Sequence, residues 1–159
     1  MAVAMYPGSF DPIHSGHVHV VEVAAQIFEK VVVAAMYNPE KEGFLSLEQR
    51  EELLNECFSH LDNVTTMRAT GLVVEAAERV SASHLVKGLR GVADLENEMQ
   101  MAQTNKTVSG IQTVFIPADP QHSYLSSRFI REIAAQAGDI TDLVPAAVAD
   151  LLMREKKSD

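Results

Sequence analysis

The sequence predicts a doubly wound α/β fold built on a parallel sheet, and three observations support this. Short apolar runs alternate with helical patterns along the chain, which is typical of consecutive βαβ units. One such run, residues 31–37, is apolar and rich in β-branched residues, as expected for a strand that helices cover on both faces. The chain has 159 residues without an internal repeat or a linker segment, so a single domain over residues 1–159 is predicted.

The first half of the chain carries the clearest local signals. Residues 3–6 are a short apolar strand that ends at Pro7-Gly8, and a helix follows from Ser15. Its apolar residues recur at helical spacing: Val20, Val21, Ala24, Ile27 and Phe28. Residues 31–37 are the second strand and residues 38–44 a polar loop. Ser46 and Gln49 have the spacing of a capping box, which predicts a helix from there to about residue 60.

The second half continues the alternation. Predicted strands cover residues 63–68, 84–86 and 111–116, predicted helices cover residues 72–80, 93–106, 126–137 and 145–156, and residues 117–124 are a loop. Ligands of such sheets bind beyond the carboxyl ends of the strands. Four segments that follow predicted strands are therefore expected to meet at one edge: residues 6–10, the loop around Lys41, residues 87–90 and residues 122–127.

Composition and charge exclude several classes of function. A formal net charge of −9 argues against binding of nucleic acid or anionic membranes. No apolar run is long enough to span a bilayer, and the N-terminus does not resemble a secretion signal. The single cysteine, Cys57, rules out an internal disulfide and fits the reducing cytoplasm, so we expect a cytoplasmic protein. A small anionic ligand held by a few cations and backbone N–H groups remains compatible with the net charge.

The stretch YPGSFDPIHSGH, residues 6–17, has the residues that such a ligand needs. Gly8 lets backbone approach closely, and Ser9 adds a hydroxyl beside it. His14 and His17 are three residues apart at a helix start, so both rings can share one face. Gly16 leaves room for a phosphate against the first helical turn, where free N–H groups favour anions. An imidazole there can donate to a phosphoryl oxygen whose charge grows during transfer.

Two other interpretations of this stretch stay open from the residues alone. The turn and its histidines can serve only to cap the helix. Alternatively, His14 and His17 can bind a metal with His19, although a zinc site needs further ligands of suitable geometry and Cys57 lies far along the chain.

A resemblance favours phosphate chemistry. GSFDPIHSGH resembles the signature of the HxGH nucleotidyltransferase superfamily. The blocks YPGSFDP…GH, NPEK, KGLRGVADLENEMQMAQTN and SYLSS are together similar to bacterial phosphopantetheine adenylyltransferases. The resemblance implies a Rossmann-like nucleotidyltransferase fold. It also implies direct in-line transfer of the adenylyl group of ATP to 4′-phosphopantetheine, which gives dephospho-coenzyme A and pyrophosphate, the penultimate step of coenzyme A biosynthesis.

The resemblance also implies roles for individual residues. It makes His17, Lys41 and Arg90 catalytic, with His17 stabilising the transition state at the α-phosphorus. It assigns the acceptor to Ser9, Lys41, Val73 and Lys87. It assigns ATP to Ser9, Phe10, His17, Gly88, Leu89, Arg90, Glu98, His122, Ser123, Tyr124, Leu125, Ser126, Ser127 and Arg128. It further implies Mg²⁺ bound with ATP and no metal held by the protein itself, a homohexamer, and feedback inhibition by coenzyme A.

The chain departs from the family pattern at several positions. His14 and His19 stand where Thr and Asp are usual, and Asn97 replaces an aromatic residue. His122 replaces an aromatic or basic residue near the adenine, and Arg128 replaces the third serine of a serine run. SSRFIR also resembles the SSTxIR of nicotinamide mononucleotide adenylyltransferases, so another phosphomonoester acceptor is the alternative within the superfamily. A catalytically silent nucleotide-binding module is the alternative from another class.

Overall fold

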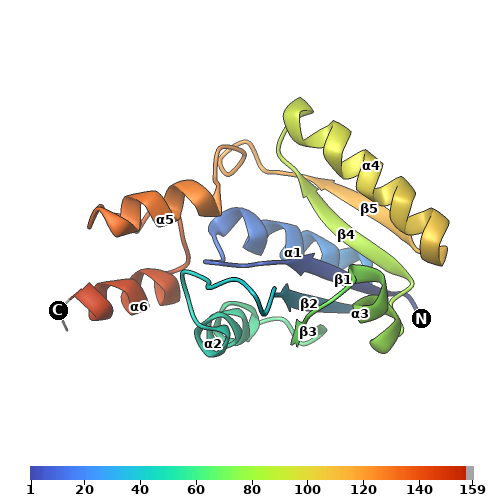
Figure 1. The fold of residues 1–159 in the computed structure, drawn as a ribbon, viewed down its shortest axis with the longest axis horizontal. Coiled ribbons are helices and arrows are strands. Elements are labelled where there is room, and N and C mark those ends of the chain that lie inside the picture. The colour runs from blue at the N-terminus through green and yellow to red at the C-terminus, as the bar shows by residue number, and fades with distance from the viewer. Residues whose placement is uncertain (157–159) are drawn as a thin grey trace.

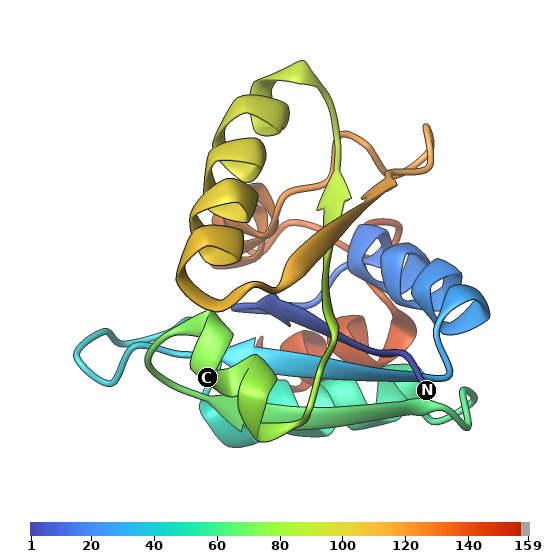
Figure 2. The same cartoon turned by 90° about the vertical axis from the view of Figure 1, so that its right-hand side faces the viewer.

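The computed structural model describes residues 1–156 as a five-stranded sheet flanked by helices (Figures 1 and 2). Residues 157–159, the end of the domain predicted over residues 1–159, lie outside the described residues. Every strand pair is parallel and the order is β3-β2-β1-β4-β5. The strands are β1 (Val3–Gly8), β2 (Lys30–Met36), β3 (Val64–Ala69), β4 (His84–Leu89) and β5 (Gln112–Pro117). The predicted doubly wound, Rossmann-like α/β fold is therefore confirmed.

The helices overlap those predicted from the sequence. They are α1 (Ser15–Ile27), α2 (Leu47–Phe58), α3 (Val73–Arg79), α4 (Val92–Ser109), α5 (Ser127–Ala135) and α6 (Ala146–Lys156). The predicted capping box is confirmed at α2, where Ser46 Oγ accepts from the Gln49 N–H at 3.1 Å and Gln49 Oε1 accepts from the Ser46 N–H at 3.0 Å. Figure 1 shows α5 and α6 together at the end of the molecule that lies away from the N-terminus.

Alternate residues of the central strands face two separate cores. Ala4 and Tyr6 of β1 belong to the larger core, which also takes apolar residues of α1, α2, α5 and α6. Met5, between them, belongs to the smaller core, together with Ala76 and Ala77 of α3. Residues 31–35 of β2 are buried without exception, as expected for a strand covered on both faces.

The sheet opens between β1 and β4 at their carboxyl ends. β1 pairs with β2 along six residues, but with β4 only through Ala4 with His84 and Met5 with Leu85. β4 stays paired with β5 up to Leu89 with Pro117. The strand order also reverses at β1 and β4, and ligands of doubly wound sheets bind at such a point.

One predicted strand end was wrong by three residues, and it lies beside this opening. The strand predicted to end at Val86 continues through Lys87, Gly88 and Leu89, because pairing with β5 holds these residues extended despite their weak strand propensity. The first strand ends at Pro7-Gly8, as predicted, and these two residues pair with β2.

Candidate active site

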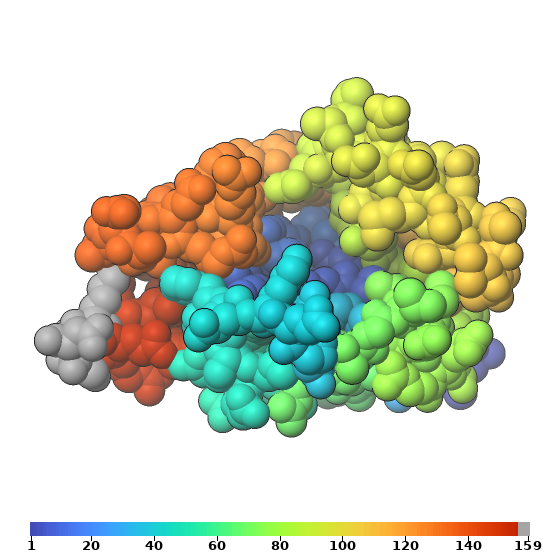
Figure 3. All heavy atoms as spheres, in the orientation of Figure 1, coloured from blue at the N-terminus to red at the C-terminus, as the bar shows by residue number. Residues whose placement is uncertain are grey.

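One face of the molecule is hollowed at the open edge of the sheet. Figure 3 shows the hollow between α3, α4, α5 and the loop that follows β2. It consists of three adjoining cavities of about 1040, 380 and 180 Å³, and Ser9 lines all three. The largest lies toward the loop of residues 37–44 and α5, the second beside α1 and Arg90, and the smallest between β4 and α4.

Most of the predicted site residues meet in this hollow. The cavity of about 380 Å³ is lined by eleven of them: Ser9, Phe10, His17, Lys87, Gly88, Arg90, Glu98, His122, Ser126, Ser127 and Arg128. Lys41 lines the largest cavity and Val73 the smallest. Segments that are far apart in the sequence thus converge at one sheet edge, as the positions of the motifs predicted.

Four predicted site residues do not line these cavities in the described structure. Leu89 belongs to β4, and its carbonyl accepts from the Ala118 N–H at 2.7 Å. Ser123 Oγ donates to the Pro120 carbonyl at 3.3 Å, and the Tyr124 ring is exposed. Leu125 is buried, and it faces the site through its carbonyl oxygen, which accepts from Arg90 Nη1 at 3.0 Å.

His14 and His17 together cap the start of α1. His14 Nδ1 accepts from the Gly16 N–H at 3.1 Å, and His17 Nδ1 accepts from the His14 N–H at 3.1 Å. Their rings stack with centroids 3.6 Å apart. A ring nitrogen that accepts a hydrogen bond carries no proton, so both imidazoles carry theirs on Nε2. His17 lines the cavity. Its capping bond uses Nδ1, so its Nε2–H is free to donate to a ligand.

Burial keeps both imidazoles neutral. It lowers the pKa of His14 to about 4, and the neighbouring Arg90 and His122 act in the same direction. Burial also holds the pKa of His17 well below its usual range, helped by His14, Arg90 and Lys87. A neutral His17 can donate one hydrogen bond to an anion without being a cation itself.

Gly8 and Gly16 leave room for the aromatic rings of neighbouring side chains. A Cβ at Gly8 would lie 3.0 Å from Phe10 Cζ, and a Cβ at Gly16 would lie 2.9 Å from His14 Cε1. Phe10 is buried with a φ of 47°, and its ring meets His17 edge to face at 5.0 Å between centroids. The glycines thus allow the packing that fixes the His17 ring.

Each cation on the β4 side of the hollow is held by a carboxylate of α4. Lys87 Nζ lies 3.6 Å from Glu98 Oε1, whereas Glu98 Oε2 is buried and has no hydrogen-bond partner within residues 1–156. Arg90 donates from Nε to Asp94 Oδ2 at 2.9 Å and from Nη2 to Asp94 Oδ1 at 3.1 Å. These side-chain hydrogen bonds lower the pKa of Asp94. The Arg90 fork is thereby oriented before any ligand binds.

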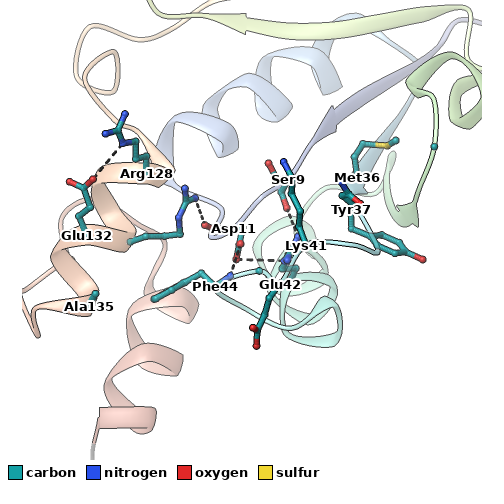
Figure 4. Close-up of a pocket in the computed structure, with 15 residues that line it drawn as sticks. Ser9, Asp11, Met36, Tyr37, Lys41, Glu42, Phe44, Arg128, Glu132 and Ala135 are labelled. Atoms are coloured by element: carbon teal, nitrogen blue, oxygen red, sulfur yellow. Dashed lines mark hydrogen bonds and ion pairs between the residues drawn. The ribbon is translucent and has the colours of Figure 1, made fainter.

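α5 contributes further groups at its N-terminus. Ser126 occupies the N-cap position, although its side chain makes no capping hydrogen bond within the described residues. Ser127 Oγ donates to the Pro12 carbonyl at 2.9 Å, which joins α5 to the first turn of the chain. Arg128 lines two of the cavities, and its Nε lies 3.4 Å from Glu132 Oε1 one turn later (Figure 4).

The metal site considered from the sequence is not formed. No group of three or more His, Cys, Asp or Glu side chains in residues 1–156 is arranged to hold a metal ion. His14 and His17 stack and cap α1, and the His19 ring lies beside His122, with centroids 6.2 Å apart.

Three charged residues that were not predicted as site residues build part of the wall of the largest cavity. Asp11, Arg50 and Arg131 line it, and Asp11 and Arg50 are buried. One signal was available for Arg50: it shares the buried face of α2 with Leu53, Leu54 and Phe58. A charged residue on an apolar helix face requires a buried partner.

Comparisons with known proteins agree on one family. Residues 5–133 match the Cytidylyltransferase-like family. The chain is 42% identical over 158 residues to the phosphopantetheine adenylyltransferase of Caldanaerobacter subterraneus subsp. tengcongensis, which covers 99% of both proteins. It is 46% identical over 148 residues to that of Gloeothece citriformis, covering 92% of this chain and 94% of the relative.

A solved structure supports the fold independently. The putative nicotinate-nucleotide adenylyltransferase of Vibrio parahaemolyticus superposes with a TM-score of 0.68, covering 96% of this chain and 99% of that one. At 18% sequence identity, this likeness concerns the fold alone.

Proposed function

The chain belongs to the phosphopantetheine adenylyltransferases of the cytidylyltransferase-like family, and from this membership we infer that it adenylylates 4′-phosphopantetheine. The enzyme is a nucleotidyltransferase of coenzyme A biosynthesis: it uses ATP and yields dephospho-coenzyme A and pyrophosphate. The resemblance of its sequence blocks and the names of its relatives point to the same reaction.

The observation that carries the proposed mechanism is the fixed tautomer of His17. Because Nδ1 accepts the His14 N–H, the proton on Nε2 is directed by the capping of α1 rather than by a ligand. We propose that this N–H donates to a non-bridging oxygen of the ATP α-phosphate. Charge grows on that oxygen as the acceptor approaches, so the hydrogen bond strengthens in the transition state.

The reaction needs no covalent intermediate. An oxygen of the 4′-phosphate attacks the α-phosphorus in line, the bond from the α-phosphorus to the bridging oxygen breaks, and pyrophosphate leaves with that electron pair. A phosphomonoester is already a nucleophile, so positioning and charge stabilisation are the main catalytic contributions. The proposed ATP residues on the β4 side, chiefly Arg90 with the α5 N-terminus, would receive the triphosphate.

We propose that the acceptor lies across Ser9, with its phosphate between Lys41 and Lys87. Ser9 lines all three cavities, so a molecule there can reach both the His17 cavity and the smallest one. The smallest cavity has mainly apolar walls, including Val73, Leu85 and Met101, and these suit the pantetheine arm.

Mg²⁺ is proposed to arrive with ATP, since this ion is commonly bound through substrate phosphates and a few carboxylates. The donor set of the hollow fits such a complex. Glu98 has an oxygen, Oε2, without a hydrogen-bond partner within residues 1–156, whereas both oxygens of Asp94 are engaged by Arg90. When bound, the ion would offset part of the phosphate charge.

Association and regulation are proposals that rest mainly on the resemblance. We propose a homohexamer inhibited by coenzyme A. Within the part of the chain that the structure describes, no residue of α4 is buried, and Val92, Met99 and Met101 are exposed on it. This exposed apolar surface is consistent with self-association. Light scattering after size exclusion, and inhibition of turnover by added coenzyme A, test these two points.

A cytoplasmic location is also proposed. Its supports are the single cysteine and the biosynthetic reaction itself. No helix in residues 1–156 combines the length and the hydropathy needed to cross a membrane. Fractionation of the native source with an assay for the activity tests this proposal.

The experiment that tests the function is pyrophosphate release from Mg–ATP with each of two acceptors, 4′-phosphopantetheine and nicotinamide mononucleotide. Turnover is expected with phosphopantetheine. His17→Ala is expected to lower kcat by about 10²–10³-fold, as for loss of one oxyanion donor. His60→Ala is the matched control, because His60 is an exposed histidine paired with Glu22 on the surface.

Each other result contradicts a specific part of the proposal. Turnover only with the mononucleotide would refute the acceptor assignment. Full activity of the His17→Ala protein would refute the role of the Nε2 proton. No turnover with either acceptor would instead favour another acceptor or a silent binding module.

A further inference from the structure

The Asp11 carboxylate is buried where the first turn of the chain meets the loop that carries Lys41. Asp11 Oδ2 accepts from the Phe44 N–H at 2.8 Å (Figure 4). Asp11 Oδ1 accepts from the Leu45 N–H, also at 2.8 Å. These bonds join positions 33 and 34 residues apart in the sequence. One carboxylate thereby fixes the end of the loop against the segment that holds Ser9.

Arg50 completes the connection from the first turns of α2. Its Nε lies 3.6 Å from Asp11 Oδ1 and donates to the Leu45 carbonyl at 3.1 Å, and its Nη1 donates to the Ser9 carbonyl at 3.5 Å. The guanidinium thus contacts the loop, the carboxylate and the backbone of Ser9. A Cβ at Gly43 would clash with Arg50 Nη2, so the loop follows the guanidinium closely.

The backbone beside Asp11 is tied to α5 as well. Arg131 Nη1 donates to the Asp11 carbonyl at 2.9 Å, and Ser127 Oγ donates to the carbonyl of Pro12 at 2.9 Å. The Asp11–Arg50 pair therefore stands at the junction of the first turn, the Lys41 loop, α2 and α5. These segments also supply groups of the proposed acceptor and triphosphate sites.

We propose that Asp11 is a positioning residue: it holds the loop of residues 38–45 so that Lys41 meets the acceptor phosphate at Ser9. The inference rests on the proposed function for what Lys41 binds. Asp11 acts through the loop and not on the substrate, since its two oxygens are occupied by the Phe44 and Leu45 N–H groups.

Charge explains why the carboxylate is paired with an arginine. An unpaired buried anion in a cleft for two polyanionic substrates would repel both of them and would be costly to bury. Arg50 makes the pair neutral while leaving the two short backbone bonds of Asp11 in place. Buried ion pairs contribute little net stability compared with apolar packing, so the role inferred for this pair is to hold the loop in place beside the acceptor site.

The test is Asp11→Asn in the full chain. An amide offers only one acceptor oxygen, so it turns an N–H donor toward one of the two backbone N–H groups. We expect kcat/KM for phosphopantetheine to fall by about 10²-fold, the loss typical of a misplacement of about 1 Å, mainly through KM. KM for ATP is expected to stay close to that of the unchanged protein. Amide hydrogen exchange at Phe44 and Leu45 is expected to accelerate.

A double-mutant cycle separates positioning from general destabilisation. If Asp11 acts through Lys41, Asp11→Asn adds little further loss in a Lys41→Ala background. Multiplicative losses, unchanged acceptor kinetics, or unchanged exchange at Phe44 and Leu45 would each overturn the proposal. If Asp11→Asn does not fold, Arg50→Lys carries the same test, because one ammonium cannot replace the fork that reaches Asp11, Leu45 and Ser9.

Glu48→Gln is the matched control. It removes an exposed carboxylate of α2 that pairs with Arg68 and takes no part in the hydrogen bonds of Asp11 and Arg50 to the loop. Acceptor kinetics and loop exchange should both stay unchanged in this variant. The exchange measurement needs no turnover, so it tests the connection between Asp11 and the Lys41 loop even if phosphopantetheine is not the acceptor. If the unchanged protein does not turn over, only the proposed function is refuted.

Discussion

Buried neutral histidines should make this protein sensitive to mild acid, and His14 provides the clearest test. Burial lowers its pKa from 6.5 to about 4 in the folded protein, whereas the unfolded chain protonates near the ordinary value. Below pH 6.5 the unfolded state therefore binds more protons than the folded state. Stability is greatest above pH 6.5, falls between pH 6.5 and about 4, and His14 adds no further loss below that.

The size of the effect follows from the two pKa values. At pH 5 about 97% of His14 is protonated in the unfolded chain and about 10% in the folded one, which gives a loss of about 2 kcal/mol from this residue. His17, whose pKa is also lowered by burial, adds to it. With a urea m-value of about 2 kcal/mol per molar, the loss from His14 alone moves the unfolding midpoint by about 1 M.

His14→Thr is the informative substitution. Threonine is a good N-cap, so the bond to the Gly16 N–H can be retained while the titrating ring is removed. Between pH 8 and pH 5, the free energy of unfolding of the variant should fall by about 2 kcal/mol less than that of the unchanged protein. The chain has no tryptophan, so unfolding is followed by circular dichroism, at one protein concentration because association shifts apparent stability.

His60→Thr, at an exposed ring, controls for loss of a histidine as such. The reasoning fails if His14→Thr and the unchanged protein lose the same free energy of unfolding between the two pH values.

Three further predictions concern separate sites. Arg90→Lys loses the bidentate contact to Asp94. It should raise KM for ATP about tenfold, the effect of one lost charge-assisted hydrogen bond. An unchanged KM would show that Arg90 does not bind ATP. Gly43→Ala forces Arg50 to move and should lower the free energy of unfolding by about 1–3 kcal/mol in urea titrations; equal stability would mean that the loop accommodates the methyl group. Burial raises the pKa of Cys57 to about 11, so iodoacetamide at pH 8 should modify it roughly 10²-fold more slowly than a free thiol, and rapid labelling would contradict this.

Local sequence signals predicted those parts of the fold that local physics decides. The apolar run of β2 and the Ser46–Gln49 capping box both appear where they were expected, because each depends on residues adjacent in the chain. The extension of β4 through Lys87 and Gly88 depends on pairing with β5, which no local pattern reports. The cap of α1 by two imidazoles was also unpredictable in detail, since histidine is not among the preferred N-cap residues.

The same distinction applies to the candidate site. The convergence of motifs was predictable, because the carboxyl ends of parallel strands must share one edge. The Asp11–Arg50 pair was not, since its members are 39 positions apart and neither motif requires the other. Such pairs follow from how loops fold back on the sheet, and a sequence shows at most the anomaly of an arginine on an apolar helix face.

The distribution of charge reconciles an acidic chain with anionic substrates. Of its 13 lysines and arginines, six line the two larger cavities: Lys41, Arg50, Lys87, Arg90, Arg128 and Arg131. The chain as a whole carries a formal charge of −9, so its surface outside the hollow is the more acidic part. Five carboxylates line the same cavities, Asp11, Glu42, Asp94, Glu98 and Glu132, so the lining carries a formal charge of +1 against −10 for the rest of the chain. A cleft that is positive relative to an acidic surface raises the local concentration of a polyanion, while the acidic remainder disfavours nucleic acid. Net charge therefore argues against extended anionic partners, whereas the cations placed in the hollow allow small anionic substrates to bind.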